Sequence, residues 1–211
     1  LALGLTPDER SALARRGSGS AARSFGDGFV EMAAGSAADG HDAVARTIAP
    51  ASQCPLALVV AVTAVGPKAI GSSEGMVRSE STSPYFEAWT RQVPRDLEAM
   101  RVAIADGDLE QVGTIAETNA MRMHAVAFSA SPPVCYWNAA TVEAMSAVRS
   151  LRDSGTGAWF TIDAGPQVKV LCAPEDAARV GSAMRDVHGV HDVLLARPGR
   201  GARILAQENV S

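Results

Sequence analysis

The pattern of apolar and polar positions along the chain predicts a mixture of strands and helices. The strongest strand signal is at residues 56–65 (LALVVAVTAV), a nearly continuous apolar run rich in β-branched residues. Such a run, bounded by prolines and a glycine, predicts a strand buried on both faces. Further strands are predicted at residues 29–32, 159–163, 167–172 and 192–196. A Gly-Pro turn joins the second and third of these, which predicts a β-hairpin.

Other segments have the apolar spacing and end signals of helices. Residues 6–9 (TPDE) combine an N-cap threonine, a proline at the first helical position and the glutamate of a capping box, which predicts a helix ending near residue 16. Residues 83–106 are expected to form two helices, or one helix kinked at Pro94. Further helices are predicted from about residue 20 and at 108–128, 138–154 and 174–188, an extended or short helical segment within 36–50, and a polar loop at 66–76.

The order of these elements predicts the fold class. From residue 56 onward the chain runs strand, helices, strand pair, helix, strand, which predicts an α+β fold with helices on one face of an antiparallel sheet. We expect a domain boundary near residue 53, and hence domains at 1–53 and 54–197 and a polar tail at 198–211. Because the chain opens on LALGL, which resembles the end of a helix, we expect the sequence to lack an N-terminal part.

Composition and charge restrict the class of protein. Of the 211 residues, 47% are hydrophobic and 20% are charged, as in ordinary globular proteins. The net charge of −4 and the pI near 5.6 provide no basic field, so nucleic acid is not an expected partner. No apolar run reaches the roughly 18 residues of a membrane span and no signal peptide is visible, so no membrane partner is expected. Three cysteines without metal-binding spacing favour reduced thiols in a cytoplasmic protein.

The most distinctive stretch is RRGSGSAARS at residues 15–24. Its two glycines allow a ligand to approach the backbone, and Ser18 and Ser20 offer hydroxyl groups and a possible helix cap. The N-terminus of a helix starting near Ser20 would bind an anion, and Arg23 would lie on the same side and hold a carboxylate or phosphate with two bonds. The alternative is a Gly/Ser turn with one solvated arginine, and these ten residues alone favour that alternative.

Two other segments carry candidate chemistry. In the loop at 66–76, Lys68, Ser72 and Ser73 lie among glycines, which suits contact with phosphate; an ordinary surface loop is equally compatible. Asp163 lies where a strand ends in a Gly-Pro turn, which makes it a candidate general base. The alternative for Asp163 is an Asx turn, which the local sequence slightly favours.

One histidine lies inside a predicted helix. A lone helical histidine such as His124 is more often a structural residue than a catalyst, and we favour the structural interpretation. Glu117 and Asn119, on the same predicted helix, are unusual in a core, so they are candidates to face a cleft.

Five motifs together resemble one enzyme family. In order along the chain they are RRGSGSAARS, GSSEGM, TSPYFEAW, ETNAMRMHA and FTIDAGP, spread over residues 1–171. In this order and at these separations they resemble the diphosphomevalonate decarboxylases of the mevalonate pathway. That family belongs to the superfamily named for galactokinase, homoserine kinase, mevalonate kinase and phosphomevalonate kinase. The resemblance implies a two-domain fold whose C-terminal domain is ferredoxin-like.

The resemblance also implies an activity and its residues. The family converts (R)-5-diphosphomevalonate and ATP, with magnesium, into isopentenyl diphosphate, ADP, phosphate and carbon dioxide. By resemblance, Asp163 acts on the 3-hydroxyl group and Arg23 holds the substrate carboxylate. Ser18 and Ser20 contact substrate, and Ser18 also contacts nucleotide. Ser72 is a candidate for substrate, and Lys68 and Ser73 for the ATP phosphates; no protein metal ligand is assigned. The resemblance further implies a cytoplasmic homodimer.

The sequence departs from the family pattern in three places. The family's lysine-containing substrate motif and its Gly/Ser-rich ATP loop, which precede this region, are not found. Asp27 stands in a run that usually ends in two glycines, and Gln167 replaces the usual asparagine after DAGP. The alternatives that we keep are a phosphomevalonate decarboxylase, a mevalonate 3-kinase, and an inactive binding or dimerisation domain.

Overall fold

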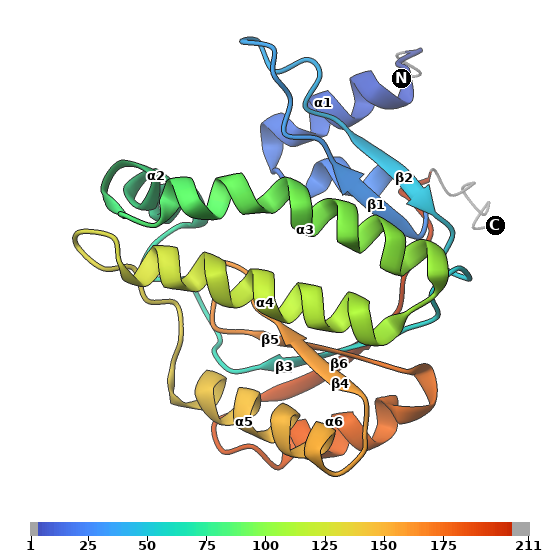
Figure 1. Ribbon diagram of the computed structural model, residues 1–211, viewed down its shortest axis with the longest axis vertical. Helices are drawn as coiled ribbons and strands as arrows, with labels where there is room; N and C mark the ends of the chain where they lie inside the picture. The colour runs from blue at the N-terminus through green and yellow to red at the C-terminus, as the bar shows by residue number, and fades with distance from the viewer. Residues whose placement is uncertain (1–3, 204–211) are drawn as a thin grey trace, which may run out of the picture. The chain divides into compact units, whose positions relative to one another are not determined.

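The computed structural model describes residues 4–203 (Figure 1). Of the described residues, 4–53 and 198–203 form one compact unit, and residues 54–197 form a second. The opening segment LALGL, residues 1–5, was expected to be the end of a helix. Its residues 4 and 5 are not helical, and residues 1–3 lie outside the described residues. Residues 204–211 of the expected tail also lie outside them. Within residues 4–203, no helix combines the length and the apolar character that a membrane crossing requires.

The first unit is a small α+β arrangement held by α1. It contains α1 (Pro7–Gly17), the 3₁₀ helix η1 (Ala21–Phe25) and the antiparallel strands β1 (Phe29–Met32) and β2 (Ala45–Ala49). α1 begins at the predicted capping box: Thr6 Oγ1 accepts from the Glu9 N–H at 3.2 Å, and the Glu9 carboxylate accepts from the Thr6 N–H at 2.8 Å. The buried Ser11 hydroxyl accepts from the Ala45 N–H at 2.8 Å and donates to the Ala22 carbonyl at 3.3 Å. One side chain of α1 therefore ties β2 to η1.

The second unit is built on a four-stranded antiparallel sheet in the order β4-β5-β3-β6. Its strands are β3 (Ala57–Val62), β4 (Ala158–Thr161), β5 (Val168–Cys172) and β6 (Asp192–Ala196). Its helices are α2 (Ser72–Thr82), α3 (Phe86–Asp106), α4 (Leu109–Phe128), α5 (Ala139–Asp153), η2 (Pro174–Asp176) and α6 (Ala177–Arg185). The four strands with α5 and α6 have the β-α-β-β-α-β order of a ferredoxin-like fold. The predicted hairpin is the β4–β5 pair.

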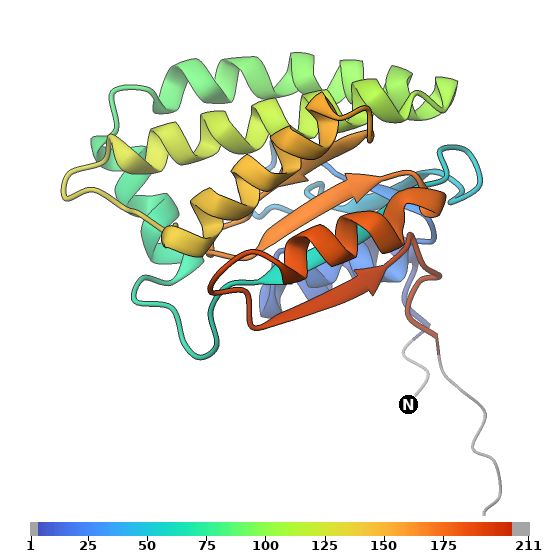
Figure 2. The same cartoon turned by 90° about the horizontal axis from the view of Figure 1, so that it is seen from below.

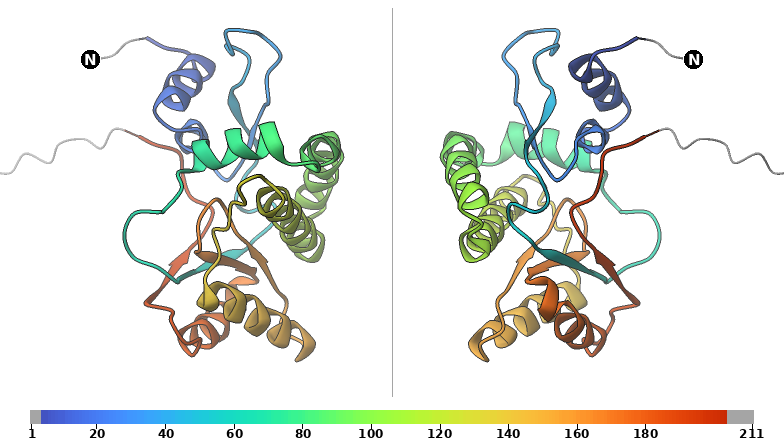
Figure 3. Two further views of the ribbon diagram at one scale, coloured as in Figure 1. Left: turned by 90° about the vertical axis from the view of Figure 1, so that its left-hand side faces the viewer. Right: turned by 90° about the vertical axis from the view of Figure 1, so that its right-hand side faces the viewer.

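Helices cover both faces of this sheet. On one face α5 and α6 pack beside each other over alternate strand residues that form the core, among them Val59, Phe160 and Val170 (Figure 2). On the other face α4 packs against β4, where Gly113 lies against the ring of Trp159, and α3 packs on α4 (Figure 3). The prediction of helices on one face only is therefore wrong. Apolar spacing identifies a helix but does not say which face of a distant sheet the helix will cover.

The central strand β3 is shorter than predicted and is fully buried on one face only. Ala57, Val59 and Ala61 are buried, whereas Leu58, Val60 and Val62 are half-buried. The end of the apolar run does not pair with another strand: Val65 is 81% exposed. Apolar character alone therefore overestimated both the length and the burial of this strand.

Two helical predictions also need correction, and one pair of alternatives is decided. Residues 72–76, expected to lie in a polar loop, belong to α2, whose hydroxyl-rich sequence has little helical signal. Its buried Gly75 packs against Tyr136, so tertiary packing stabilises this helix. Of the two alternatives for residues 83–106, the single helix is the one found, because α3 continues through Pro94. The helix expected from residue 20 is the five-residue 3₁₀ helix η1.

Candidate active site

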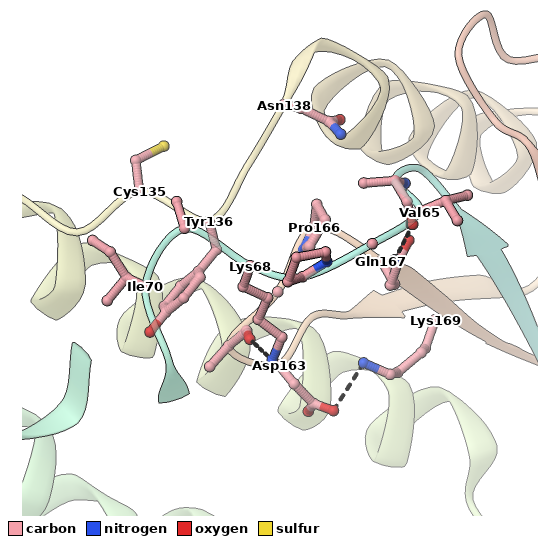
Figure 4. Close-up of a pocket in the computed structure, with 16 residues that line it drawn as sticks. Val65, Lys68, Ile70, Cys135, Tyr136, Asn138, Asp163, Pro166, Gln167 and Lys169 are labelled. Carbon is pink, nitrogen blue, oxygen red and sulfur yellow. Dashed lines mark hydrogen bonds and ion pairs between the residues drawn. The ribbon is translucent and has the colours of Figure 1, made fainter. Parts of the chain in front are cut away.

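A cavity of about 380 Å³ opens in the second unit beside the β4–β5 turn (Figure 4). Three segments line it: the loop after β3, the segment that leads into α5, and the turn with the start of β5. Its polar or reactive side chains are those of Lys68, Cys135, Tyr136, Asn138, Asp163, Gln167 and Lys169. Of the site residues predicted in this unit, Lys68 and Asp163 line the cavity.

Asp163 lies directly after β4, and its side chain is 77% exposed. Its carboxylate Oδ2 lies 2.8 Å from Nζ of Lys169, which projects from β5 (Figure 4). The backbone turns sharply here, since the Gly165 N–H donates to the Asp163 carbonyl at 2.7 Å. The carboxylate is therefore presented at the cavity wall, where a bound molecule can come within hydrogen-bond reach, as a general base requires.

The backbone after Asp163 is fixed by the side chain of Gln167 and by side chains from two other elements, the end of β3 and α5. Gln167 Oε1 accepts from the Thr63 N–H at 2.6 Å, and Gln167 Nε2 donates to the Ala64 carbonyl at 2.7 Å. The hydroxyls of Thr63 and Thr141 donate to the Pro166 carbonyl at 2.7 and 2.8 Å. Glutamine at this position, a departure from the family pattern, thus bridges the start of β5 to the end of β3.

Lys68, in the loop after β3, contacts the same turn. Lys68 Nζ donates to the Ala164 carbonyl and to Ser72 Oγ, the latter at 3.2 Å. Ser72 and Ser73 are the first two residues of α2, with Gly71 as its N-cap, so they do not lie in a loop as predicted. Ser73 is exposed and is not among the residues that line the cavity.

The first unit brings Ser18 and Ser20 together, and neither is among the residues that line the cavity beside Arg23. The Ser18 and Ser20 hydroxyls are 3.0 Å apart. Arg23, on η1, lines a second polar cavity of about 380 Å³, which Arg200 also lines. The predicted helix N-terminal anion site is wrong, since η1 is a short 3₁₀ helix and Ser20 makes no cap hydrogen bond. No pattern in the sequence points to Arg200, because it lies in a polar segment 177 residues after Arg23.

Asp27, the other departure from the family pattern, has a structural partner. Its Oδ1 accepts from the Gly201 N–H, and the neighbouring Gly28 N–H donates to the Gly199 carbonyl at 2.9 Å. The Ala202 N–H donates to the Ser24 carbonyl at 2.6 Å. Asp27 therefore belongs to a set of hydrogen bonds that ties residues 199–202 to the segment after η1.

His124 is fully buried and lies beside Tyr136, one of the residues that line the cavity. Its Nε2 lies 3.2 Å from the Ile162 carbonyl, and the rings of Phe128, Tyr136 and Trp137 surround it. Burial lowers the pKa of His124, and the contact with the Ile162 carbonyl opposes this to a smaller extent. A neutral imidazole that donates from Nε2 satisfies this geometry, which agrees with the structural interpretation of the residue.

Glu117 and Asn119 have structural partners and do not line the cavity. The Glu117 carboxylate accepts from Arg152 Nη1 at 3.0 Å and from the Phe160 N–H at 3.2 Å. Asn119 Nδ2 donates to Asp96 Oδ2 at 3.0 Å. The suggestion that these two polar residues face a cleft is therefore wrong.

The ferredoxin-like sheet, its covering helices and the lysine-lined cavity define an α+β protein with the fold of the galactokinase, homoserine kinase, mevalonate kinase and phosphomevalonate kinase superfamily. A family model for the mevalonate 5-diphosphate decarboxylase C-terminal domain matches residues 58–201. A model for the diphosphomevalonate decarboxylase-like N-terminal domain matches residues 1–45. The chain therefore belongs to the mevalonate 5-diphosphate decarboxylase family.

Individual relatives agree with this assignment. The diphosphomevalonate decarboxylase of Gibberella zeae is 33% identical over 190 residues, which cover 88% of this chain and 50% of that protein. The human enzyme of the same name is 33% identical over 178 residues, covering 82% and 44%. The chain thus spans about half the length of these relatives.

Solved structures show the same fold. The mevalonate diphosphate decarboxylase of Enterococcus faecalis gives a TM-score of 0.84 at 33% identity, covering 94% of this chain and 60% of that one. The Staphylococcus aureus enzyme gives a TM-score of 0.87 at 28% identity, covering 97% and 62%. A complex of MDDEF with MVAPP, AMPPCP and magnesium gives a TM-score of 0.85 at 34% identity, covering 94% and 61%.

Proposed function

We propose that this chain provides part of an enzyme that decarboxylates (R)-5-diphosphomevalonate at the expense of ATP. The observation that carries the proposal is the exposed Asp163 carboxylate at a lysine-lined cavity, in a chain that belongs to the decarboxylase family. The products would be isopentenyl diphosphate, ADP, phosphate and carbon dioxide. The phosphomevalonate decarboxylase and mevalonate 3-kinase alternatives are not favoured, since the relatives are named for the diphosphate substrate.

We assign Asp163 the role of accepting or orienting the proton of the 3-hydroxyl group. As the hydroxyl oxygen attacks the γ-phosphorus of ATP, the proton passes to the carboxylate and ADP departs. The C3–O bond then breaks and inorganic phosphate leaves with the bonding electrons. The carboxylate C–C bond supplies the electron pair of the new double bond, and carbon dioxide is released. The exposure of Asp163 suits this role, because a buried carboxylate could not meet a tertiary hydroxyl.

We assign the anionic groups of the substrates to the cationic and hydroxyl side chains predicted from the sequence. Lys68 and Ser73, together with Ser18, would contact the ATP phosphates, and Ser72 and Ser20 would contact the substrate. Arg23 would hold the substrate carboxylate through its planar guanidinium group, which matches a carboxylate in a bidentate pair.

Magnesium is expected to accompany ATP and to neutralise the charge that develops on the phosphates. Among the described residues, no three carboxylate, histidine or cysteine side chains converge on one point. In nucleotide sites magnesium commonly takes only one or two protein carboxylates, and the phosphates supply other ligands. The complex of MDDEF with MVAPP, AMPPCP and magnesium supports ATP and magnesium as partners of the family.

The proposal is tested by coupled ADP release with diphosphomevalonate and MgATP. The assay is run on the 211-residue chain and on the product of the complete reading frame that contains it. Turnover in the second protein, with release of carbon dioxide, supports the proposal. Absence of turnover in both contradicts it and favours a binding or dimerisation module.

Asp163→Asn in the active protein tests the assigned base. We expect turnover to fall by at least about 10²-fold, the usual contribution of a general base. The dissociation constant for diphosphomevalonate should stay within about threefold, because the substituted group acts mainly in the chemical step. Asp106→Asn, at an exposed position near the end of α3, is the matched control and should leave both quantities unchanged. Full turnover in D163N would count heavily against the assignment.

We further propose that residues 1–53 are the remainder of the N-terminal kinase-superfamily domain and that 54–197 form the C-terminal domain. The two family models meet near the boundary between the two compact units, which supports this division. A cytoplasmic homodimer is proposed from the resemblance. Light scattering coupled to size-exclusion chromatography tests the dimer, and a monomeric mass at micromolar concentration would contradict it.

A further inference from the structure

The chain contains 17 arginines but only two lysines, Lys68 and Lys169, and both line the same cavity. Arginine supplies the other cations of the chain, including the surface ion pairs of α2 and α3. Lysine differs from arginine in carrying a compact charge that can donate to several acceptors from one atom. The two lysines of this protein therefore coincide with the place where chemistry is proposed.

The strand register determines where Lys169 points. Lys169 pairs with Thr161 of β4 in the antiparallel ladder, two residues before Asp163. Its neighbours Val168 and Val170 point into the core beneath α5 and α6, so alternation places Lys169 on the opposite face, toward the cavity. The lysine side chain is 24% exposed, whereas that of its partner Asp163 is 77% exposed. The lysine of the ion pair is therefore half-buried against the protein, whereas the Asp163 carboxylate is exposed to the cavity.

The two lysines contact different atoms of the turn that follows β4. Lys169 contacts the Asp163 carboxylate at 2.8 Å, and Lys68 donates to the carbonyl of the next residue, Ala164. Without Lys169, the Asp163 side chain would keep full rotamer freedom at an exposed turn. Holding the carboxylate in one orientation has a large effect on the rate of the chemical step, because a misplacement of about 1 Å lowers that rate on the order of 10²-fold.

We propose that Lys169 is the positioning residue of this site, whose ammonium group holds the Asp163 carboxylate in the orientation that meets the substrate hydroxyl. The proposal rests on the proposed function. Lys169 acts through Asp163 and does not bind the phosphates directly, so its removal affects the rate of the chemical step more than substrate binding. The opposing assignment, direct contact of Lys169 with a phosphate group, would raise KM instead.

The kinetic test compares Lys169→Met with Lys169→Arg in the active protein. Methionine keeps much of the aliphatic length of the lysine side chain without its charge. We expect kcat of K169M to fall by on the order of 10- to 100-fold, with the KM for diphosphomevalonate and the KM for ATP each within about threefold of the wild type. Arginine keeps a cation beside Asp163 and should recover kcat to within about fivefold. Arg91→Met, which removes an exposed ion pair on α3, is the control for loss of a cation and should leave kcat unchanged. A raised KM with unchanged kcat in K169M, or no change at all, would overturn the proposal.

A second measurement does not depend on activity. Because the 211-residue chain has two lysines, selective ¹⁵Nζ-lysine labelling should give two side-chain ammonium signals in an NMR spectrum, and K169R identifies one by its loss. We expect Asp163→Asn to shift the Lys169 signal and Asp106→Asn to leave it in place. An unmoved Lys169 signal in D163N would refute the ion pair even if the enzyme were active. A shifted signal in a chain without turnover would support the pairing while the proposed function fails.

Discussion

Replacing Gly113 by alanine should test how closely α4 packs on the sheet. Gly113 lies in the second turn of α4, and a Cβ atom built there would come within 2.6 Å of Trp159 Cε3 and closer still to Cγ and Cδ2 of the same ring. Real Cβ atoms essentially never approach a neighbour so closely. Trp159 is only 8% exposed, so its ring has little room to swing aside, and α4 or β4 must shift.

The size of the effect follows from two opposing contributions. Overpacking a core costs about 1–3 kcal/mol, and contact with three ring atoms at once places this substitution in the upper half of that range. Alanine in place of glycine stabilises a helix interior by about 0.5–1 kcal/mol. We therefore expect G113A to lower the free energy of unfolding by roughly 2 kcal/mol.

Urea unfolding followed by tryptophan fluorescence measures this change in the relevant unit. All three tryptophans, Trp89, Trp137 and Trp159, lie in the second unit, so the signal reports on that unit alone. Gly181→Ala in α6 is the matched control, because a Cβ there would meet its nearest neighbours, in Arg185 and Val193, at 3.6 and 3.9 Å. That variant should be more stable by about 0.5–1 kcal/mol. A G113A midpoint equal to or above that of the wild type would refute the close packing of α4 on Trp159.

Three further predictions concern the surroundings of the two cavities. Since burial lowers the pKa of His124 below 6.5 in the folded state, its contribution to stability is complete above pH 6.5 and is lost as the pH falls. In urea unfolding, the advantage of the wild type over H124Q should shrink below pH 6.5 by at most about 1.4 kcal/mol per pH unit; a constant difference would contradict this. Gln167→Ala leaves backbone groups of Thr63 and Ala64 without partners and should cost about 1–3 kcal/mol in the same assay, and an unchanged midpoint would show that the bridge is dispensable. Asp27→Gly should speed tryptic cleavage after Arg200, because the segment at 199–202 loses a hydrogen bond; equal cleavage rates would argue against that anchoring role.

The sequence by itself determined the elements whose signals are local. The capping box at Thr6 lies where the side chains predicted it, because a cap depends on residues within one helical turn. The β4–β5 hairpin also follows from alternation and a short turn. The family was predicted from motif order, since the motifs keep the residue types that contact ligands irrespective of the packing around them. The α+β class was predicted correctly as well.

The tertiary structure decided everything that depends on partners distant in the sequence. α2 has a weak helical signal and is stabilised where Gly75 meets Tyr136, and α4 covers the second face of the sheet because Gly113 leaves room for Trp159. The ion pair between Asp163 and Lys169 requires the β4–β5 register, because only the pleat places both side chains on the same face. Such contacts are fixed by where the chain returns in space, and hydrophobic periodicity contains no information about that return.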